Sequence, residues 1–220
     1  LTVSDSNGKR IQLTDEITSY NYEVNYFTKY DYHELESKNL FNTGKQWFGE
    51  YFSNNEEYNF NFNFKNRIET EPIYINARAV GRSSNNFVLD FFVSNNKILS
   101  LPIFNSSNFS SILGETQESN LFFHDQNNLQ IKVSLNNNFN ISSYAYLDFI
   151  EVQAKCQIVF DGTQLLITEP ETVEKKRVTK FNINSDYELF NVWDVTDPLN
   201  VNEIYISNAV SYTHLTLPTT

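Results

Sequence analysis

The sequence predicts an all-β protein, an antiparallel β-sandwich of jelly-roll type with flanking strands. Three observations predict it: apolar and polar residues alternate in many short segments, turn-forming residues separate these segments, and aromatic residues make up 15% of the 220 residues. Alternation with a period of two places the apolar side chains of a strand on one face and the polar ones on the other. Two sheets built from such strands bury their apolar faces by packing together.

The individual strands follow from this alternation. Over residues 58–64 aromatic residues alternate with asparagines, and residues 129–135 and 150–160 repeat the pattern with mainly aliphatic side chains. Further strand-like segments lie at residues 21–27, 73–80, 87–93, 97–103, 164–168 and 203–206. Turn-forming residues, chiefly Gly, Asn and Ser, occupy residues 81–86, 94–96 and 161–162 between them.

Composition divides the chain into four parts. We expect flanking strands over residues 1–40, the β-sandwich domain over residues 41–180, terminal strands over residues 181–209 and a tail at residues 210–220. Within the second part, the charged residues 169–177 predict a solvated loop.

The tail has a composition of its own. Residues 210–219 (VSYTHLTLPT) are similar to a one-frame translation of a transposase-type sequencing adaptor, so we treat residues 210–220 as artefactual and leave them out of the fold prediction. Because the chain also contains no Met, we expect a gene fragment from environmental DNA that is cut at both ends.

Charge and cysteine content exclude several classes of protein. The net charge is −11 and no basic stripe is present, which argues against a nucleic-acid partner. The single Cys excludes an internal disulfide framework. No apolar segment approaches the length that spans a bilayer, so no transmembrane segment is expected.

Cys156 and His124 are the residue types of a catalytic nucleophile and its base. In the predicted strand, however, Cys156 shares a face with Val152, Ala154 and Ile158, which favours a small buried core residue. A reactive thiolate needs a charged and partly exposed setting, which this pattern does not supply.

Metal sites are not predicted either. Asp148 with Glu151, or Asp194 with Asp197, could supply calcium ligands, but no Asp-rich loop of regular spacing surrounds them. The two histidines outside the tail lie far apart in the sequence and make no zinc-ligand spacing. We therefore predict no catalytic residue, no cofactor and no metal for this chain.

The aromatic residues have two interpretations. Exposed rings could form a platform for stacking sugars, whereas rings at strand spacing fill the space between two sheets. We prefer the core interpretation for Phe60, Phe62, Phe64, Phe91 and Phe92.

Two segments are more distinctive. In residues 43–52 (TGKQWFGEYF) two glycines bracket Trp47 and Phe48, which predicts a tight turn that presses both rings into the core. Residues 190–198 (FNVWDVTDP) predict a strand that ends in a sharp turn, because Pro198 forces Asp197 into extended geometry.

Together these segments resemble the region before the catalytic domain in the gingipain-like sortases of the type IX secretion system, the PorU family. Between them, residues 145–154 (AYLDFIEVQA) and 157–162 (QIVFDG) are similar to two successive strands of that family. The three segments occur in the family's order and extend over most of the chain. The matching residues, for which a structural role is expected, are Gly44, Lys45, Trp47, Phe48, Gly49, Glu50, Leu147, Asp148, Ile150, Glu151, Trp193, Asp194, Thr196, Asp197 and Pro198.

The resemblance implies a cysteine peptidase at the outer membrane and cell surface, which removes C-terminal sorting signals from secreted proteins and joins the new end to a lipopolysaccharide. Its Cys and His would lie in a caspase-like α/β domain after Pro198, missing from this chain, since Cys156 and His124 match nothing catalytic in the family. The chain is then expected to be non-enzymatic and to support its own downstream catalytic domain, with an outer-membrane secretion protein as a further partner.

Three other functions remain open on the sequence. The chain could be a carbohydrate-binding module of a secreted protein, an adhesin-type structural repeat, or a small hydrolase that uses Cys156. Sugar binding, a repeated downstream module or reactivity of the folded thiol would distinguish them.

Overall fold

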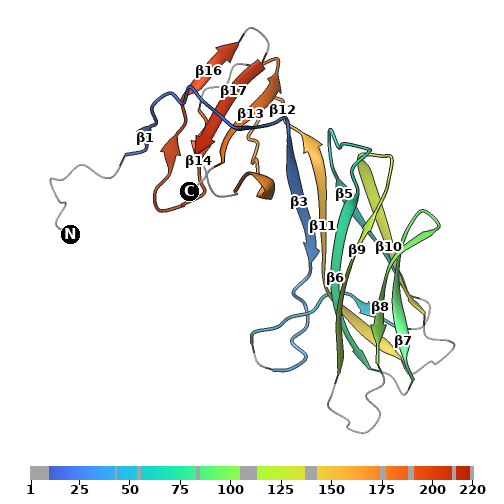
Figure 1. Ribbon diagram of the computed structural model, residues 1–220. Coiled ribbons are helices and arrows are strands. Elements are labelled where there is room, and N and C mark those ends of the chain that lie inside the picture. The colour runs from blue at the N-terminus through green and yellow to red at the C-terminus, as the bar shows by residue number, and fades with distance from the viewer. Residues whose placement is uncertain are drawn as a thin grey trace, which may run out of the picture. The chain divides into compact units, whose positions relative to one another are not determined.

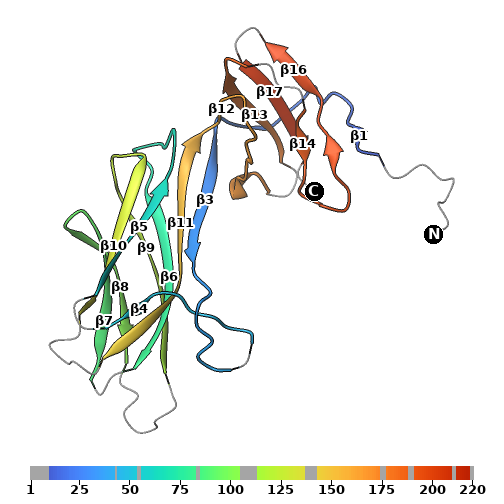
Figure 2. The same cartoon turned by 180° about the vertical axis from the view of Figure 1, so that it is seen from behind.

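The computed structural model describes residues 10–42, 44–53, 56–82, 85–104, 113–136, 143–173, 177–187, 191–209 and 212–218, with side chains described as far as residue 206. These residues form seventeen strands and one short 3₁₀ helix, which confirms the all-β prediction (Figures 1 and 2). The chain divides into two compact units. One is Lys29–Cys156, and the other combines Leu1–Thr28 with Gln157–Thr220.

The unit Lys29–Cys156 is a sandwich of two sheets. The first sheet has the order β5 (Glu57–Asn63), β10 (Asn128–Asn136), β7 (Phe87–Val93) and β8 (Asn96–Ile103). The second has the order β3 (Tyr26–Glu34), β11 (Tyr144–Gln157), β6 (Ile73–Arg82) and β9 (Gly114–Phe122), with β4 (Tyr51–Phe52) also paired to β11. The pairs β5–β10, β10–β7, β7–β8, β11–β6, β6–β9 and β4–β11 are antiparallel, which confirms the predicted sandwich.

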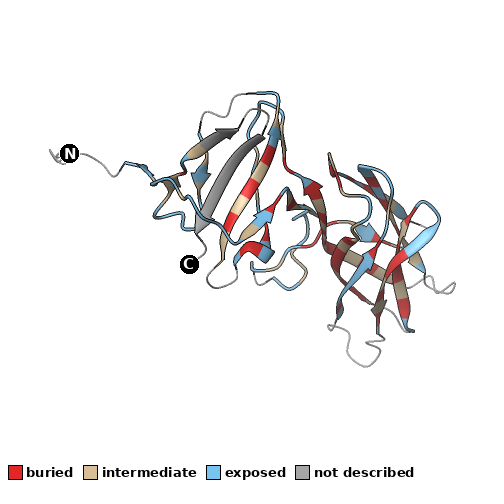
Figure 3. Cartoon of the chain, turned by 45° about the horizontal axis from the view of Figure 1, so that its top comes forward, coloured by how far each residue is buried: buried red, intermediate tan, exposed pale blue. Residues whose placement is uncertain are grey.

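Strand β5 shows how the alternating sequence builds the core. Its Phe60 and Phe62 are buried, and the asparagines between the aromatic residues are exposed. The register places Phe60 opposite Ile131 and Phe62 opposite Leu129 of β10, so aromatic and aliphatic side chains pack in cross-strand pairs. Figure 3 shows the same change between buried and exposed residues along the strands.

The predicted core placement is wrong for Phe92. Phe91 is fully buried, and successive residues of a strand point to opposite faces, so Phe92 is only half-buried. The ammonium of Lys132 lies 5.6 Å from the centre of its ring.

Strand β11 carries the longest alternation. Its buried side chains are Ala145, Leu147, Ile150, Val152, Ala154 and Cys156, together with the partly shielded Asp148. A β-bulge lies between Leu147 and Phe149 and inserts one extra residue into the ladder with β6. The bulge lets Ile150 continue the buried face, and it leaves Phe149 and Glu151 on the outer face.

The units differ from the predicted domain bounds of 41–180. Strand β3 belongs to the second sheet although its sequence alternates tyrosines with polar and charged residues rather than with aliphatic ones. Such a pattern is typical of a strand that has little buried surface, and its pairing with β11 could not be inferred from periodicity. Residues after Cys156 belong to the other unit.

The second unit contains two smaller sheets. One has the order β12 (Val159–Phe160), β13 (Val178–Ser185), β17 (Tyr212–Pro218) and β16 (Ile206–Ala209), with β2 (Tyr22–Val24) also paired to β13. The other has the order β1 (Gln12–Leu13), β15 (Asn202–Glu203) and β14 (Trp193–Asp194). The pairs β12–β13, β2–β13 and β1–β15 are parallel. The pairs β13–β17, β16–β17 and β14–β15 are antiparallel, so the antiparallel prediction holds for only part of this unit.

Two predictions for this unit are wrong: the strand at residues 164–168 and the solvated loop at residues 169–177. Residues 164–168 form no strand, because Leu166 is exposed and the segment has no buried face. Residues 169–177 are not simply a solvated loop, since Glu169 is buried and accepts a hydrogen bond of 3.0 Å from the Thr28 hydroxyl, ahead of the 3₁₀ helix Pro170–Val173. The tail contributes β17, which pairs with β13 through backbone groups that any sequence can supply.

Candidate functional surface

The structure brings together two of the three segments that resemble the PorU family. The Gly49 amide donates a hydrogen bond of 2.7 Å to the Leu147 carbonyl, and the Leu147 amide donates one of 3.0 Å to the Glu50 carbonyl. Strand β4 continues this ladder beside Ala145 and Tyr146. Gly49 is required here, because a Cβ at this position would lie 2.9 Å from the carbonyl oxygen of Leu35.

The two aromatic residues of the first segment have different environments. Phe48 is fully buried, as predicted, and its ring packs edge-on against Phe41 at 5.8 Å. Trp47 is 39% exposed, so the prediction that it is a core residue is wrong. Neighbouring residues of an extended segment face opposite ways, and Phe48 occupies the inward position. Gly44 takes a positive φ of 68°, as the predicted turn requires, and Lys45 is exposed.

Glu50 and His33 join this segment to β3. The Nε2 atom of His33 lies 2.8 Å from Oε1 of Glu50, and the His33 ring packs on Phe60 at 4.6 Å. The other carboxylate oxygen of Glu50 is buried and has no hydrogen-bond partner among the described residues. The His33–Glu50 pair thus holds β3 against residues 43–52 on the inner side of the sheet.

Asp148 is held by an arginine. Nη1 of Arg78 donates a hydrogen bond of 2.7 Å to Asp148, and Nε of the same guanidinium donates one of 2.9 Å to Glu115. Burial raises the pKa of Asp148, and the charge of Arg78 opposes that rise. The Asp148 carboxylate is therefore part of an ion-pair network with Arg78 and Glu115.

Glu151 accepts hydrogen bonds from neutral amides. Asn76 donates one of 3.1 Å to Oε2, and Gln153 donates another to Oε1. Asn76 in turn accepts a bond of 3.1 Å from Gln117. This network crosses β11, β6 and β9 on the outer face of the second sheet.

The third segment lies in the other unit. Trp193 and Asp194 form β14, and the backbone then turns at residues 196–200 as predicted. Asp194 accepts a hydrogen bond of 3.0 Å from the Thr196 amide, and Asp197 accepts one of 2.9 Å from the Leu199 amide after Pro198. Trp193 is 53% exposed. These carboxylates cap a turn rather than gather around an ion.

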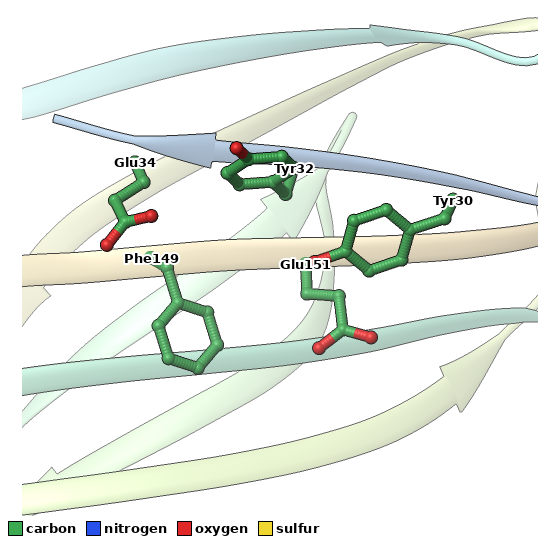
Figure 4. Close-up of a pocket in the computed structure, with 5 residues that line it drawn as sticks. All are labelled: Tyr30, Tyr32, Glu34, Phe149 and Glu151. Atoms are coloured by element: carbon green, nitrogen blue, oxygen red, sulfur yellow. The ribbon is translucent and has the colours of Figure 1, made fainter. Parts of the chain in front are cut away.

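An open depression of about 400 Å³ lies on the outer face of β3 and β11. It is lined by Tyr30, Tyr32, Glu34, Phe149 and Glu151 (Figure 4). Both tyrosines are more than half exposed, and their ring centres are 5.6 Å apart. Burial, followed by the negative charge of Glu151 and the neighbouring groups, raises the pKa of Tyr30.

Sequence reasoning missed most of this surface. It selected Glu151 through the family resemblance, but not the residues of β3 or Phe149. A signal was present in the alternation of Tyr30, Tyr32 and Glu34 at spacing two, which places all three on one face of a strand. Their proximity to β11 depends on which strand pairs with β3, and the spacing of residues within β3 gives no information about that.

Cys156 is a core residue, as predicted. Its side chain is fully buried, and its sulfur lies 3.8 Å from the carbonyl oxygen of Ala154. Burial raises the pKa of the thiol to about 11, although Lys29 and Arg67 act in the opposite direction. The environment thus favours the neutral thiol, the opposite of what a nucleophile needs.

This environment predicts the reactivity of the thiol. Because the thiolate is the reactive form and its pKa is raised, the folded chain should show almost no reaction with a disulfide reagent at pH 8. The single Cys should react fully after unfolding in guanidinium. Rapid labelling of the folded chain at pH 8 would contradict the buried placement and revive the hydrolase interpretation.

The described residues contain neither a metal-binding cluster nor a membrane-spanning helix. No cluster of three or more His, Cys, Asp or Glu side chains suited to a metal was found there. Within the same part of the chain, no helix has the length and apolar character needed to cross a membrane.

Comparison with known proteins places the fold. No protein-family model and no curated protein matches the sequence. Among solved structures, the chain is similar to dimeric latent PorU from Porphyromonas gingivalis, with a TM-score of 0.77 and 16% identity over 94% of this chain. The chain thus has a PorU-like fold. It covers 20% of the length of that PorU chain.

Two carbohydrate-binding modules are similar over a smaller part. One is a CBM36 module in complex with calcium and xylotriose, with a TM-score of 0.34 and 19% identity over 46% of this chain and 76% of the module. The other is the CBM36-1 domain of a xylanase from the hindgut metagenome of Trinervitermes trinervoides, with a TM-score of 0.39 and 13% identity over 57% of this chain and 95% of the domain. At these scores neither module is informative about function.

Proposed function

We propose that this chain is the non-catalytic β region that precedes the catalytic domain in a PorU-like sortase. The observation that carries the proposal is the likeness in fold to PorU, which extends over 94% of the chain and includes both compact units. A likeness limited to the sandwich would support the proposal less, because many unrelated proteins contain a β-sandwich.

The contacts of the motif residues support the proposal. Residues 44–50 and 147–151 were selected by resemblance in sequence, and their backbones are hydrogen-bonded to each other at Gly49, Glu50 and Leu147. Their side chains form the ion pairs and amide contacts of one sheet. They build a scaffold, and they do not converge on a reacting centre.

The role of the whole protein follows the same proposal. The complete protein would be a cysteine peptidase at the cell surface that processes C-terminal signals of type IX secreted proteins. This chain would support the catalytic domain and contact a secretion partner in the outer membrane. The nucleophile and base would come from the downstream domain, since Cys156 is buried with a raised pKa.

The deciding experiment is to recover the gene from the source DNA and to read it beyond codon 209. The proposal predicts an α/β domain with a Cys and a His placed for catalysis. The recovered protein should cleave a reporter that carries a type IX C-terminal signal, and replacement of the downstream Cys by Ala should abolish cleavage. A second copy of the sandwich or a glycoside hydrolase domain at this position would overturn the proposal.

A further inference from the structure

The outer face of β3 and β11 combines exposed aromatic rings with carboxylates. In the depression, Tyr30 and Tyr32 are 52% and 55% exposed, and Phe149 is half-buried beside them. Figure 4 shows the side chains of Glu34 and Tyr32 extending from β3, and those of Phe149 and Glu151 extending from the neighbouring β11. Rings that are half exposed offer part of their surface to a ligand.

The carboxylates of this depression have no cationic partner within the described residues. Glu151 accepts its hydrogen bonds from the neutral amides of Asn76 and Gln153. Glu34 is exposed and forms no ion pair in the same part of the chain. The nearby guanidinium of Arg78 is already shared between Asp148 and Glu115. The depression therefore has a negative potential that the protein itself does not neutralise.

The aromatic character continues along β11. Tyr144 and Tyr146 lie on its outer face with Tyr51 of β4, whose ring centre is 5.9 Å and 5.0 Å from theirs. From Tyr144 to Glu151 the strand extends over roughly 20 Å at the usual rise per residue. A surface of this length matches several residues of an extended ligand rather than one isolated group.

We propose that this surface binds an extended basic segment of another protein, with a Lys or Arg side chain seated in the depression between Glu34 and Glu151. The cation would lie against the tyrosine rings, where their negative π faces attract it, and would pair with a carboxylate of the depression. The apolar parts of the segment would lie along the remaining aromatic residues of β11. The proposal does not depend on which domain follows this chain.

A neutral sugar fits the surface less well. Its hydroxyl groups could bond to the carboxylates, but they would bring no charge to offset the desolvation of Glu34 and Glu151. A basic side chain supplies both the charge and the partner for the rings. Charge complementarity thus favours the basic peptide over the oligosaccharide.

Binding of two synthetic heptapeptides by the full chain tests the proposal. One peptide alternates Lys with Gly, and the other alternates Glu with Gly as its charge-reversed counterpart. Calorimetry at physiological salt should show binding of the Lys peptide alone. The double variant Glu34→Gln/Glu151→Gln should weaken this binding roughly tenfold, because it removes both negative charges of the depression.

Controls separate this surface from the overall negative charge. Glu57→Gln removes an exposed carboxylate of the opposite sheet and should leave binding unchanged. The single variant Glu34→Gln alters no hydrogen bond of the Glu151 network, so its melting temperature should match that of the parent chain. Tyr32→Ala should also weaken the Lys peptide.

Three results would overturn the proposal. One is no binding of the Lys peptide at millimolar concentration, and another is equal weakening by Glu57→Gln. The third is binding of neutral xylohexaose or cellohexaose that Tyr32→Ala removes and the Glu-to-Gln variants do not, which would assign the surface to a sugar instead.

Discussion

Replacing Phe48 with Ala is expected to lower the free energy of unfolding by about 3–5 kcal/mol. Phe48 is fully buried in the sandwich unit, and its ring contacts Phe41. Its backbone also exchanges hydrogen bonds with Lys38, at 2.9 Å in each direction. The substitution removes a large apolar side chain from a fully buried position and leaves a cavity there.

Trp47→Ala is the matched control for this prediction. Trp47 precedes Phe48, but it is 39% exposed, so its loss should cost clearly less than the loss of the fully buried Phe48. Urea denaturation followed by far-ultraviolet circular dichroism measures both variants. If the two substitutions cost the same, or if Trp47→Ala costs more, the inward placement of Phe48 is wrong.

Replacing Arg67 with Leu should be the second most damaging change, at about 2–4 kcal/mol. Arg67 is 7% exposed, and its Nη1 donates hydrogen bonds to the carbonyls of Ile68 at 3.1 Å and Glu71 at 3.3 Å. Its Nη2 donates to the His124 carbonyl. One guanidinium therefore bridges carbonyl groups of two separate loops. Leu would remove this bridge, and of the three carbonyls Ile68 would keep the hydrogen bond from the Glu71 amide.

Lys132→Leu provides the comparison for Arg67→Leu. Lys132 is 40% exposed and pairs with Glu57 at 3.3 Å on the sandwich surface. Exposed ion pairs contribute little, so this change should cost less than about 1 kcal/mol by the same urea measurement. A cost for Arg67→Leu no larger than that for Lys132→Leu would show that water replaces the guanidinium and that Arg67 does not hold the loops.

Most strands were predictable because their cores depend on local alternation. Strands β5, β7, β8 and β10 follow the predicted segments closely, since burial of every second residue appears in the sequence as alternating apolar and polar residues. Strand β9 was not predicted. Its residues Gly114–Phe122 are mostly polar and mostly exposed, and its place beside β6 rests on backbone pairing.

The candidate surface was predictable only in part. Glu151 could be selected by resemblance, and the spacing of Tyr30, Tyr32 and Glu34 indicates a shared face. The approach of these residues to Phe149 required the pairing of β3 with β11 and the bulge after Leu147. Neither the pairing nor the bulge is visible in a periodicity. The pairing joins β3 to a strand more than a hundred positions later, and the bulge after Leu147 forms opposite Ala79 of β6, which is also far away in the sequence.

The sequence by itself determined the all-β class, the sandwich, the buried Cys156 and the segments that resemble the PorU family. Each of these depends on side-chain character at fixed local spacing, which the chain carries wherever it folds. Tertiary structure alone decided that Phe48 and not Trp47 enters the core, that β3 joins the sandwich, and that aromatic rings and unneutralised carboxylates meet on its outer face. These outcomes depend on which strands pair and in which register, and a shift of one residue would reverse every face.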